Sequence, residues 1–441
     1  MKRKSLIFKA LVFLVTIICA TNARSQYLMD MLDTTKELGR SNRDMLTKFD
    51  HIRISGYMQP QFQVASEKGA KGYSGGDFAT GVDNRFMLRR GRIRFEYART
   101  DRERRNQLQF VFQFDGTERG VFIRDFWGRV WENKLELFAF TTGMFARPFG
   151  FEVNYSSGVR EAPERGRMSQ ILMKTERDLG FMISMEDRRK KSFTSHFRID
   201  AGIFNGQGLT APNEYDSYKD LIGQLVWKTS KIAEKLYAGG GISLMNGGIA
   251  QIVNVTYRIS EKSGAPNFVA DSITSVKGTK LPRKYSGVNL QLKYMTSWGA
   301  TELRGEFWKG TQTAYQFTSE TPGTQPLDAV GKLLPMYVRP FSGGFLVFLQ
   351  NIVNKKHQVG IKYDWYDPNT KIAGTALGLN NNFNQADIKY GTLGFGYIYY
   401  MSENFKITFW YDRVKNEYTS FHGYEKDIDD NVFTCRLQFM F

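Results

Sequence analysis

Residues 85–115 read RFMLRRGRIRFEYARTDRERRNQLQFVFQFD, and this stretch decides the fold. Between Arg90 and Tyr97 charged and apolar side chains alternate. After a charged break at 100–105 the alternation resumes between glutamines and apolar residues. A period of two residues is typical of a β-strand, because successive side chains point to opposite faces. The break is short enough to join antiparallel neighbours. The stretch therefore predicts a hairpin with one apolar and one cationic face.

Two environments would accommodate the apolar face of this hairpin. In a soluble protein it would pack on a core, whereas in an outer-membrane barrel it would face lipid and leave the arginines lining water. The mean hydropathy is −0.41, yet aromatic residues make up 15% of the chain. A transmembrane barrel combines these values, because half of each strand is polar and aromatic side chains gather at the interfaces. On composition alone, a large soluble sandwich or propeller is the alternative fold.

The N-terminus indicates export. Basic residues at 2–4 and 9 precede an apolar run at 10–20, which is followed by small and polar residues. This order is typical of a secretory signal peptide, and the run is too short to span a membrane as a helix. We expect cleavage after Ser25, with Ala20 and Ala23 as alternatives.

Residues 1–25 contain five basic residues and no acid, so their removal lowers the net charge from +17 to +12. For an exported chain this excess points to small anions or anionic lipid rather than nucleic acid. Cys435 is the one cysteine outside the signal peptide, which excludes an internal disulfide. Residues 26–50 form an N-terminal periplasmic segment with apolar residues at alternating steps of four and three. A short helix or coiled coil and a solvated tether both fit this pattern.

From residue 51 the two-residue period continues to the C-terminus. The segments lie near 51–63, in both arms of 85–115, and near 121–131, 135–145, 180–187, 192–204, 219–228, 236–246, 288–294, 303–307, 345–349, 359–365, 393–399, 405–411 and 433–441. Short turns alternate with longer connections, as periplasmic turns and external loops do in outer-membrane barrels. About sixteen strands leave room for an aqueous channel. We therefore predict that residues 51–441 form an all-β, transmembrane antiparallel β-barrel.

Alternation stops between 146 and about 179, at the third external loop by this count. A structureless stretch well beyond about 12–15 residues usually has a function. We expect this loop to fold inward and narrow the barrel, while a surface loop of mixed charge is the alternative.

An arginine on the lipid face costs about 2–4 kcal/mol at the membrane midplane, so the hairpin arginines are expected to face the lumen. A row of guanidinium groups suits anion selection, because each stays charged and offers a planar fork to oxyanions. The predicted pore-lining and anion-binding residues are Arg53, Arg90, Arg92, Arg94, Arg147, Arg160, Arg165, Lys174 and Arg177. The alternative is that these residues pair with acids and only stiffen the wall.

Several short motifs carry a family resemblance. They are GMFARPFGFE at 143–152, ER at 164–165, RDLG at 177–180, FNGQG at 204–208, RR at 89–90 and DG at 115–116. With these motifs the chain resembles the phosphate-selective porin O and P family of Gram-negative outer membranes. The resemblance implies a trimer of sixteen-stranded barrels that pass phosphate or polyphosphate along lumen arginines. The terminal Phe441 resembles the signal read by the barrel-assembly machinery.

These observations predict an outer-membrane porin for passive diffusion with anion preference, in contact with outer-membrane lipid and without a cofactor. A general non-specific porin and a non-conducting structural or adhesion barrel remain as alternatives. We do not expect an enzyme, because the four histidines are scattered and neither G-x-S-x-G nor H-E-x-x-H occurs.

Overall fold

The computed structural model describes residues 51–189, 192–209, 214–262, 264–271, 277–324, 327–328, 330–378 and 382–441. The expected signal peptide and the segment at 26–50 lie outside these residues.

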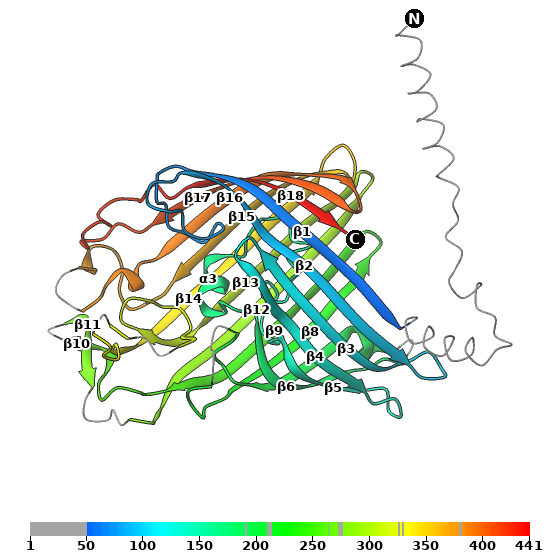
Figure 1. Cartoon of the computed structure of the whole chain (residues 1–441), viewed down its shortest axis with the longest axis horizontal. Coiled ribbons are helices and arrows are strands. Elements are labelled where there is room, and N and C mark those ends of the chain that lie inside the picture. The colour runs from blue at the N-terminus through cyan, green and yellow to red at the C-terminus, as the bar shows by residue number, and fades with distance from the viewer. Residues whose placement is uncertain are drawn as a thin grey trace, which may run out of the picture. The chain divides into compact units, whose positions relative to one another are not determined.

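Sixteen strands form a closed antiparallel barrel (Figure 1). They are β1 (Ile52–Ala65), β2 (Asn84–Thr100), β3 (Asn106–Thr117), β4 (Gly120–Trp131), β5 (Phe138–Ala146), β6 (Arg177–Glu186), β7 (Phe197–Phe204), β8 (Asp220–Ala233), β9 (Leu236–Ala250), β12 (Lys280–Thr296), β13 (Gly299–Tyr315), β14 (Met336–Asn351), β15 (His357–Asp367), β16 (Tyr390–Ser402), β17 (Phe405–Asn416) and β18 (Val432–Met440). β9 pairs with β12, and β18 pairs with β1 to close the sheet. The predicted barrel of about sixteen strands is confirmed.

One hairpin was not expected from the sequence. Within the polar stretch 247–283, β10 (Thr256–Lys262) pairs with β11 (Ala265–Asp271), and β10 also contacts the start of β14. This hairpin stands outside the closed ring. It was missed because the stretch is polar overall and was interpreted as a loop.

Side-chain direction follows the predicted alternation. On β2, Ile93 is 45% exposed and Phe95 39%, whereas Arg92 is 5% exposed. The same pattern recurs on β13, where Leu303 and Phe307 are exposed and Trp308 is buried. Apolar side chains on the outer surface are stable only where lipid replaces water, so this pattern is the expected one for a membrane barrel.

The connections differ in length at the two ends of the barrel. Most are long at one end and short at the other, but β3 and β4 are joined by residues 118–119 alone at the long-loop end. Gly120 permits this tight turn with φ +138°, a region that other residues rarely adopt. The connections contain α3 (Arg167–Leu172), η2 (Phe193–His196), η3 (Gly374–Ala376) and η4 (Gln385–Asp387). None of the helices in the described ranges is long and apolar enough to cross a membrane.

The main apolar cluster joins residues 147–176, called the 147–176 segment below, to the barrel strands. Phe149 packs edge-on against Trp308 of β13, with ring centroids 4.8 Å apart. Leu172 and Met173 of the same segment are fully buried in this cluster. The segment is therefore fixed by apolar packing as well as by the polar contacts described next.

Candidate functional site

The carboxylate of Glu306 on β13 binds the backbone of the 147–176 segment. It accepts hydrogen bonds from the N–H groups of Phe151 (2.7 Å) and Glu152 (2.9 Å) and from Nε1 of Trp308 (2.8 Å). Gly150 has φ +69°, and a methyl group at this position would overlap the Glu306 carboxylate. Glycine is therefore required where the segment meets β13.

Other strands bind the segment at different points. Lys362 of β15 donates to Glu152 Oε1 at 2.6 Å, and Asp364 accepts from the backbone N–H of Arg167 at 3.0 Å. On β18, Gln438 donates to the carbonyl of Gly158 at 2.7 Å. Three strands of the C-terminal half of the barrel thus contact one segment.

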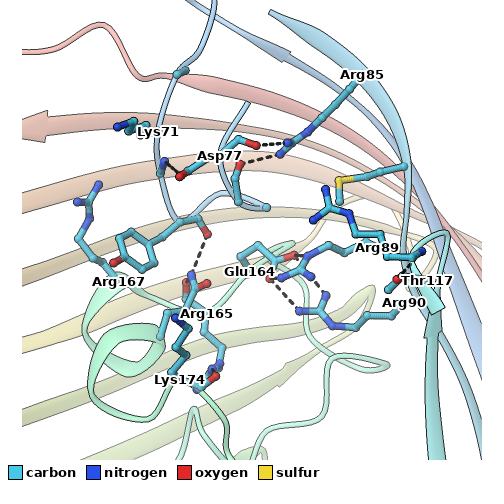
Figure 2. A pocket seen from close by; sticks show the side chains of 18 of the residues that line it. Lys71, Asp77, Arg85, Arg89, Arg90, Thr117, Glu164, Arg165, Arg167 and Lys174 are labelled. Atoms are coloured by element: carbon cyan, nitrogen blue, oxygen red, sulfur yellow. Dashed lines mark hydrogen bonds and ion pairs between the residues drawn. The ribbon is translucent and has the colours of Figure 1, made fainter. Parts of the chain in front are cut away.

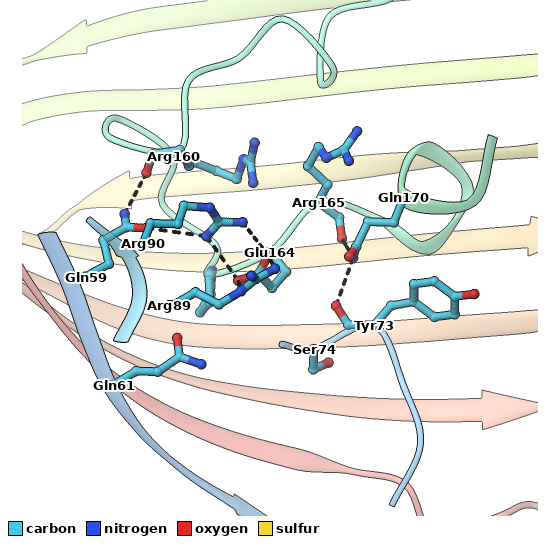
Figure 3. Close-up of polar contacts among 12 residues, drawn as sticks. Gln59, Gln61, Tyr73, Ser74, Arg89, Arg90, Arg160, Glu164, Arg165 and Gln170 are labelled. Carbon is cyan, nitrogen blue, oxygen red and sulfur yellow. Dashed lines mark hydrogen bonds and ion pairs between the residues drawn. The ribbon is translucent and has the colours of Figure 1, made fainter. Parts of the chain in front are cut away.

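Glu164 is the centre of a cationic cluster (Figure 3). Its carboxylate pairs with Arg89 at 2.9 Å and with Arg90 at 2.9 Å. It also pairs with Arg436 of β18 at 2.6 Å. All three contacts are charge-assisted hydrogen bonds from guanidinium groups. One buried negative charge is thus shared by three positive charges.

A second cluster surrounds Glu176 at the end of the segment. Glu176 pairs with Arg124 at 2.6 Å, with Arg165 at 3.4 Å and with Arg177 at 3.7 Å. Arg124 also lies 3.5 Å from Asp115, which pairs with Arg92 at 3.0 Å.

Asp125 completes this cluster through its pair with Arg177 at 3.1 Å. The two clusters together contain Arg89, Arg90, Arg92, Arg124, Arg165, Arg177 and Arg436 against Asp115, Asp125, Glu164 and Glu176. Seven basic groups therefore face four acidic groups, an excess of three positive charges.

Both clusters border a cavity of about 1450 Å³. Figure 2 shows Arg89, Arg90 and Glu164 on one side of it and Arg165, Arg167 and Lys174 on another. Eleven basic and nine acidic residues line the cavity. A second cavity of about 260 Å³ is lined by five arginines and three acids, with Trp127 and Trp131 among them. Positive charge exceeds negative charge in both.

Glu164 and Glu176 stay ionised at neutral pH. Burial opposes ionisation of Glu164, but the charges of Arg89, Arg90 and Arg436 hold the pKa of its carboxyl well below its usual range. Arginines 124, 165 and 177 act in the same way against burial, and they hold the pKa of Glu176 well below its usual range. Burial lowers the pKa of Arg160 to about 10, which leaves that side chain charged at pH 7. The positive excess is thus present at neutral pH.

The structure brings four of the nine residues predicted for the site into the two clusters, as ion pairs rather than as a free row. Arg90 and Arg92 pair with acids as described, and Arg94 pairs with Glu96 on its own strand at 3.0 Å. Lys174 borders the large cavity and pairs with Glu320 at 2.6 Å. Arg165 and Arg177 belong to the Glu176 cluster.

Three further predicted residues also lie outside the two clusters. Arg53 is exposed near the start of β1 and does not border the large cavity. Arg147 is 1% exposed and donates to the carbonyl of Thr175, while its Nε and Nη1 have no hydrogen-bond partner among the described residues. Arg160 is also buried and donates to the carbonyl of Tyr155 at 2.9 Å, and its Nε and Nη1 likewise lack a partner in the described chain.

Several residues of the site were not predicted. Arg304, Lys362 and Arg436 face inward between apolar neighbours, so the alternation of their strands carried a signal that the prediction did not use. Arg124 gave no clear signal, because the register between β3 and β4 shifts at Gln113 and Phe114 and breaks the alternation.

No family model and no curated protein matches the chain. Among solved structures, it is similar to the outer membrane channel DcaP of Acinetobacter baumannii, with a TM-score of 0.53 and 11% identity over 88% of this chain and 97% of that chain. It is also similar to OmpT of Vibrio cholerae in a trimer form, with a TM-score of 0.49 and 11% identity over 88% of this chain and 99% of that chain. For OmpF of Salmonella typhi in complex with daunomycin, the TM-score is 0.49 and the identity is 10% over 88% of this chain and 97% of that chain.

At such low identity the likeness concerns the fold. The closed sixteen-stranded sheet and the similarity to DcaP show a porin-type barrel of the bacterial outer membrane.

Proposed function

We propose that the protein is a diffusion channel that prefers anions. The observation that carries this proposal is the excess of seven arginines over four carboxylates in the two clusters beside the large cavity. Each of these four carboxylates is paired with at least one guanidinium group, so an entering anion meets three positive charges that the acids of the clusters do not balance. Pores select anions with such groups of arginine and lysine.

The proposal includes a role for the 147–176 segment. Its contacts with β13, β15 and β18 support a position across the lumen, where it narrows the channel. It also supplies Glu164, Arg165 and Glu176 to the charged clusters. We further propose phosphate-like solutes and a homotrimer, both of which rest on the family resemblance.

The first experiment measures the reversal potential of the purified protein in planar bilayers under a KCl gradient. We expect a potential of the sign that shows chloride to be more permeant than potassium. A clear preference for potassium contradicts the proposal. The absence of conductance steps favours the alternative of a structural, non-conducting barrel.

Single-channel recordings with added phosphate identify the solute more closely. If phosphate binds in the channel, millimolar phosphate reduces the chloride current in a saturable way. A linear, non-saturating response indicates a general anion channel without a phosphate site.

Replacing Glu306 by alanine tests the role of the segment. The substitution removes the acceptor of two backbone N–H groups of the segment and of the Trp308 indole. Each buried donor left unsatisfied costs about 1–3 kcal/mol, so the segment is expected to leave β13 part of the time. We expect a higher single-channel conductance with frequent transitions between levels.

The matched control is Glu302→Ala. Glu302 also lies on β13, but it pairs with Lys293 and Arg304 rather than with the backbone of the segment. Conductance and noise close to those of the unmodified protein are expected for this control. The same conductance change in both variants would mean that loss of any carboxylate on this strand, and not release of the segment, is responsible.

A further inference from the structure

A groove on the outer wall of the barrel is not explained by diffusion through the lumen. It measures about 910 Å³ and crosses β7, β8, β9, β12, β13 and β14, which are consecutive in the sheet. Leu221, Leu244 and Phe307 line it and are 58%, 60% and 38% exposed. These side chains point outward, so the groove opens toward lipid.

Small residues leave this space open. On β8, Gly223 is the outward residue between the bulkier Leu221 and Leu225. Ala201 on β7 is paired with Gly223 and also faces outward. A Cβ added at Gly223 would meet no heavy atom closer than the Asp200 carbonyl oxygen at 3.8 Å. The groove is apolar along this part, so it suits a hydrocarbon chain.

Two lysines stand at the end of the groove nearer the long loops. Lys284 of β12 and Lys309 of β13 are exposed and share the outward direction of Val288 and Phe307. Lys309 lies opposite Ser286, the next outward residue after Lys284, so the two ammonium groups are diagonal neighbours on adjacent strands.

The nearby acids do not neutralise these lysines. Asp220 pairs with Arg283 and Glu302 pairs with Lys293, and both pairs are on the lumen side. In the described parts of the six strands, no outward position holds an aspartate or a glutamate. A second copy that docked through these six strands would therefore bring no acid to the lysines, and Asp367 at the end of the adjacent β15 accepts from the backbone N–H of Asn369. The negative charge that would balance the two lysines must therefore come from a partner of another kind.

We propose that this groove binds a phosphorylated lipid of the outer leaflet. Its phosphate lies on Lys284 and Lys309, and an acyl chain lies along Leu221, Leu244 and Phe307. The long loops of outer-membrane barrels are external, which places the lysines just beyond the apolar band that begins at Val288. Headgroup charge and acyl chain thus meet complementary parts of one groove.

The test uses the full-length protein in detergent and diphosphoryl lipid A as the probe. Native mass spectrometry counts the bound lipid during a titration. We expect the K284A/K309A variant to bind roughly 30-fold more weakly, since each lysine near an anionic headgroup contributes roughly fivefold. The G223F variant keeps both charges but fills the groove, and it is expected to weaken binding as well. Lipid A without its phosphates is expected to bind poorly to the unmodified protein.

The matched control is K231A/K235A, which removes two exposed lysines at the opposite end of β8 and its turn. Binding by this control is expected to be unchanged. Undiminished binding by K284A/K309A, equal loss in the control, or displacement of the lipid by millimolar inorganic phosphate alone would overturn the proposal. Disulfide-linked dimers of a K309C variant in a C435S background would assign the groove to a second copy of this chain and overturn it too.

Discussion

Replacing Arg92 by glutamate is expected to abolish or reverse the anion preference. The change lowers the charge of the two clusters from plus three to plus one, because a positive group becomes negative. A unit charge about 8 Å from a permeant ion contributes roughly 0.5 kcal/mol in water. The substitution changes the charge by two units and shifts the energies of anions and cations in opposite directions, so their relative permeation changes by about 2 kcal/mol. Screening at 0.1 M salt roughly halves this free-energy difference. The remaining difference is still large enough to cancel a weak preference for anions over cations. The reversal potential under a KCl gradient measures the effect.

Two further variants separate charge from structure. Arg92 also donates to Tyr57 and to Ser157 of the 147–176 segment, so its loss disturbs the wall as well as the field. Arg92→Met removes one charge and is expected to give about half the shift in reversal potential. Arg102→Glu makes the same two-unit change in an exposed turn and is expected to leave the potential unchanged. An unaltered potential in the Arg92→Glu channel would remove this arginine from the mechanism of selection.

A large loss of local stability is expected when Asp387 is replaced by alanine. Asp387 lies in η4, is fully buried, and pairs with the equally buried Arg339 of β14 at 2.9 Å. Arg339 also donates to carbonyls of 315–318, so this one side chain joins two long connections to the barrel. Removing one partner of a buried pair typically costs about 3–5 kcal/mol, because the other charge stays buried. Opening of the connection at 368–389 should therefore become more than roughly a hundredfold more frequent.

Trypsin cleavage at the exposed Lys371 and Lys389 measures this opening. The control is Arg258→Ala, which breaks the half-exposed pair between Arg258 and Asp271 and is expected to change cleavage little. A double variant, R339M/D387L, removes both charges and is expected to recover much of the resistance. Equal cleavage of the Asp387→Ala variant and the unmodified protein would show that the pair does not hold this connection.

The alternation of side chains determined much of this structure by itself. A strand has a period of two, so the exposed Ile93 and Phe95 and the inward Arg90, Arg92 and Arg94 follow from local sequence once lipid is the outer solvent. The same rule gave the number of barrel strands. It did not reveal the β10–β11 hairpin, which lies within a polar stretch, or the two-residue turn at 118–119.

Only the tertiary structure decided which charges meet. Glu164 pairs with Arg436, which is 272 residues away in the sequence, because closure of the sheet places β18 beside β1 and the 147–176 segment reaches it. The binding of that segment by Glu306 depends in the same way on a distant strand. Local alternation tells which face a side chain takes, but ion pairs depend on the distance between segments far apart in the chain. The sequence therefore predicted Arg90 on the lumen side, and the fold determined that Arg90 would share the carboxylate of Glu164 with Arg89 and Arg436, which the sequence had not indicated.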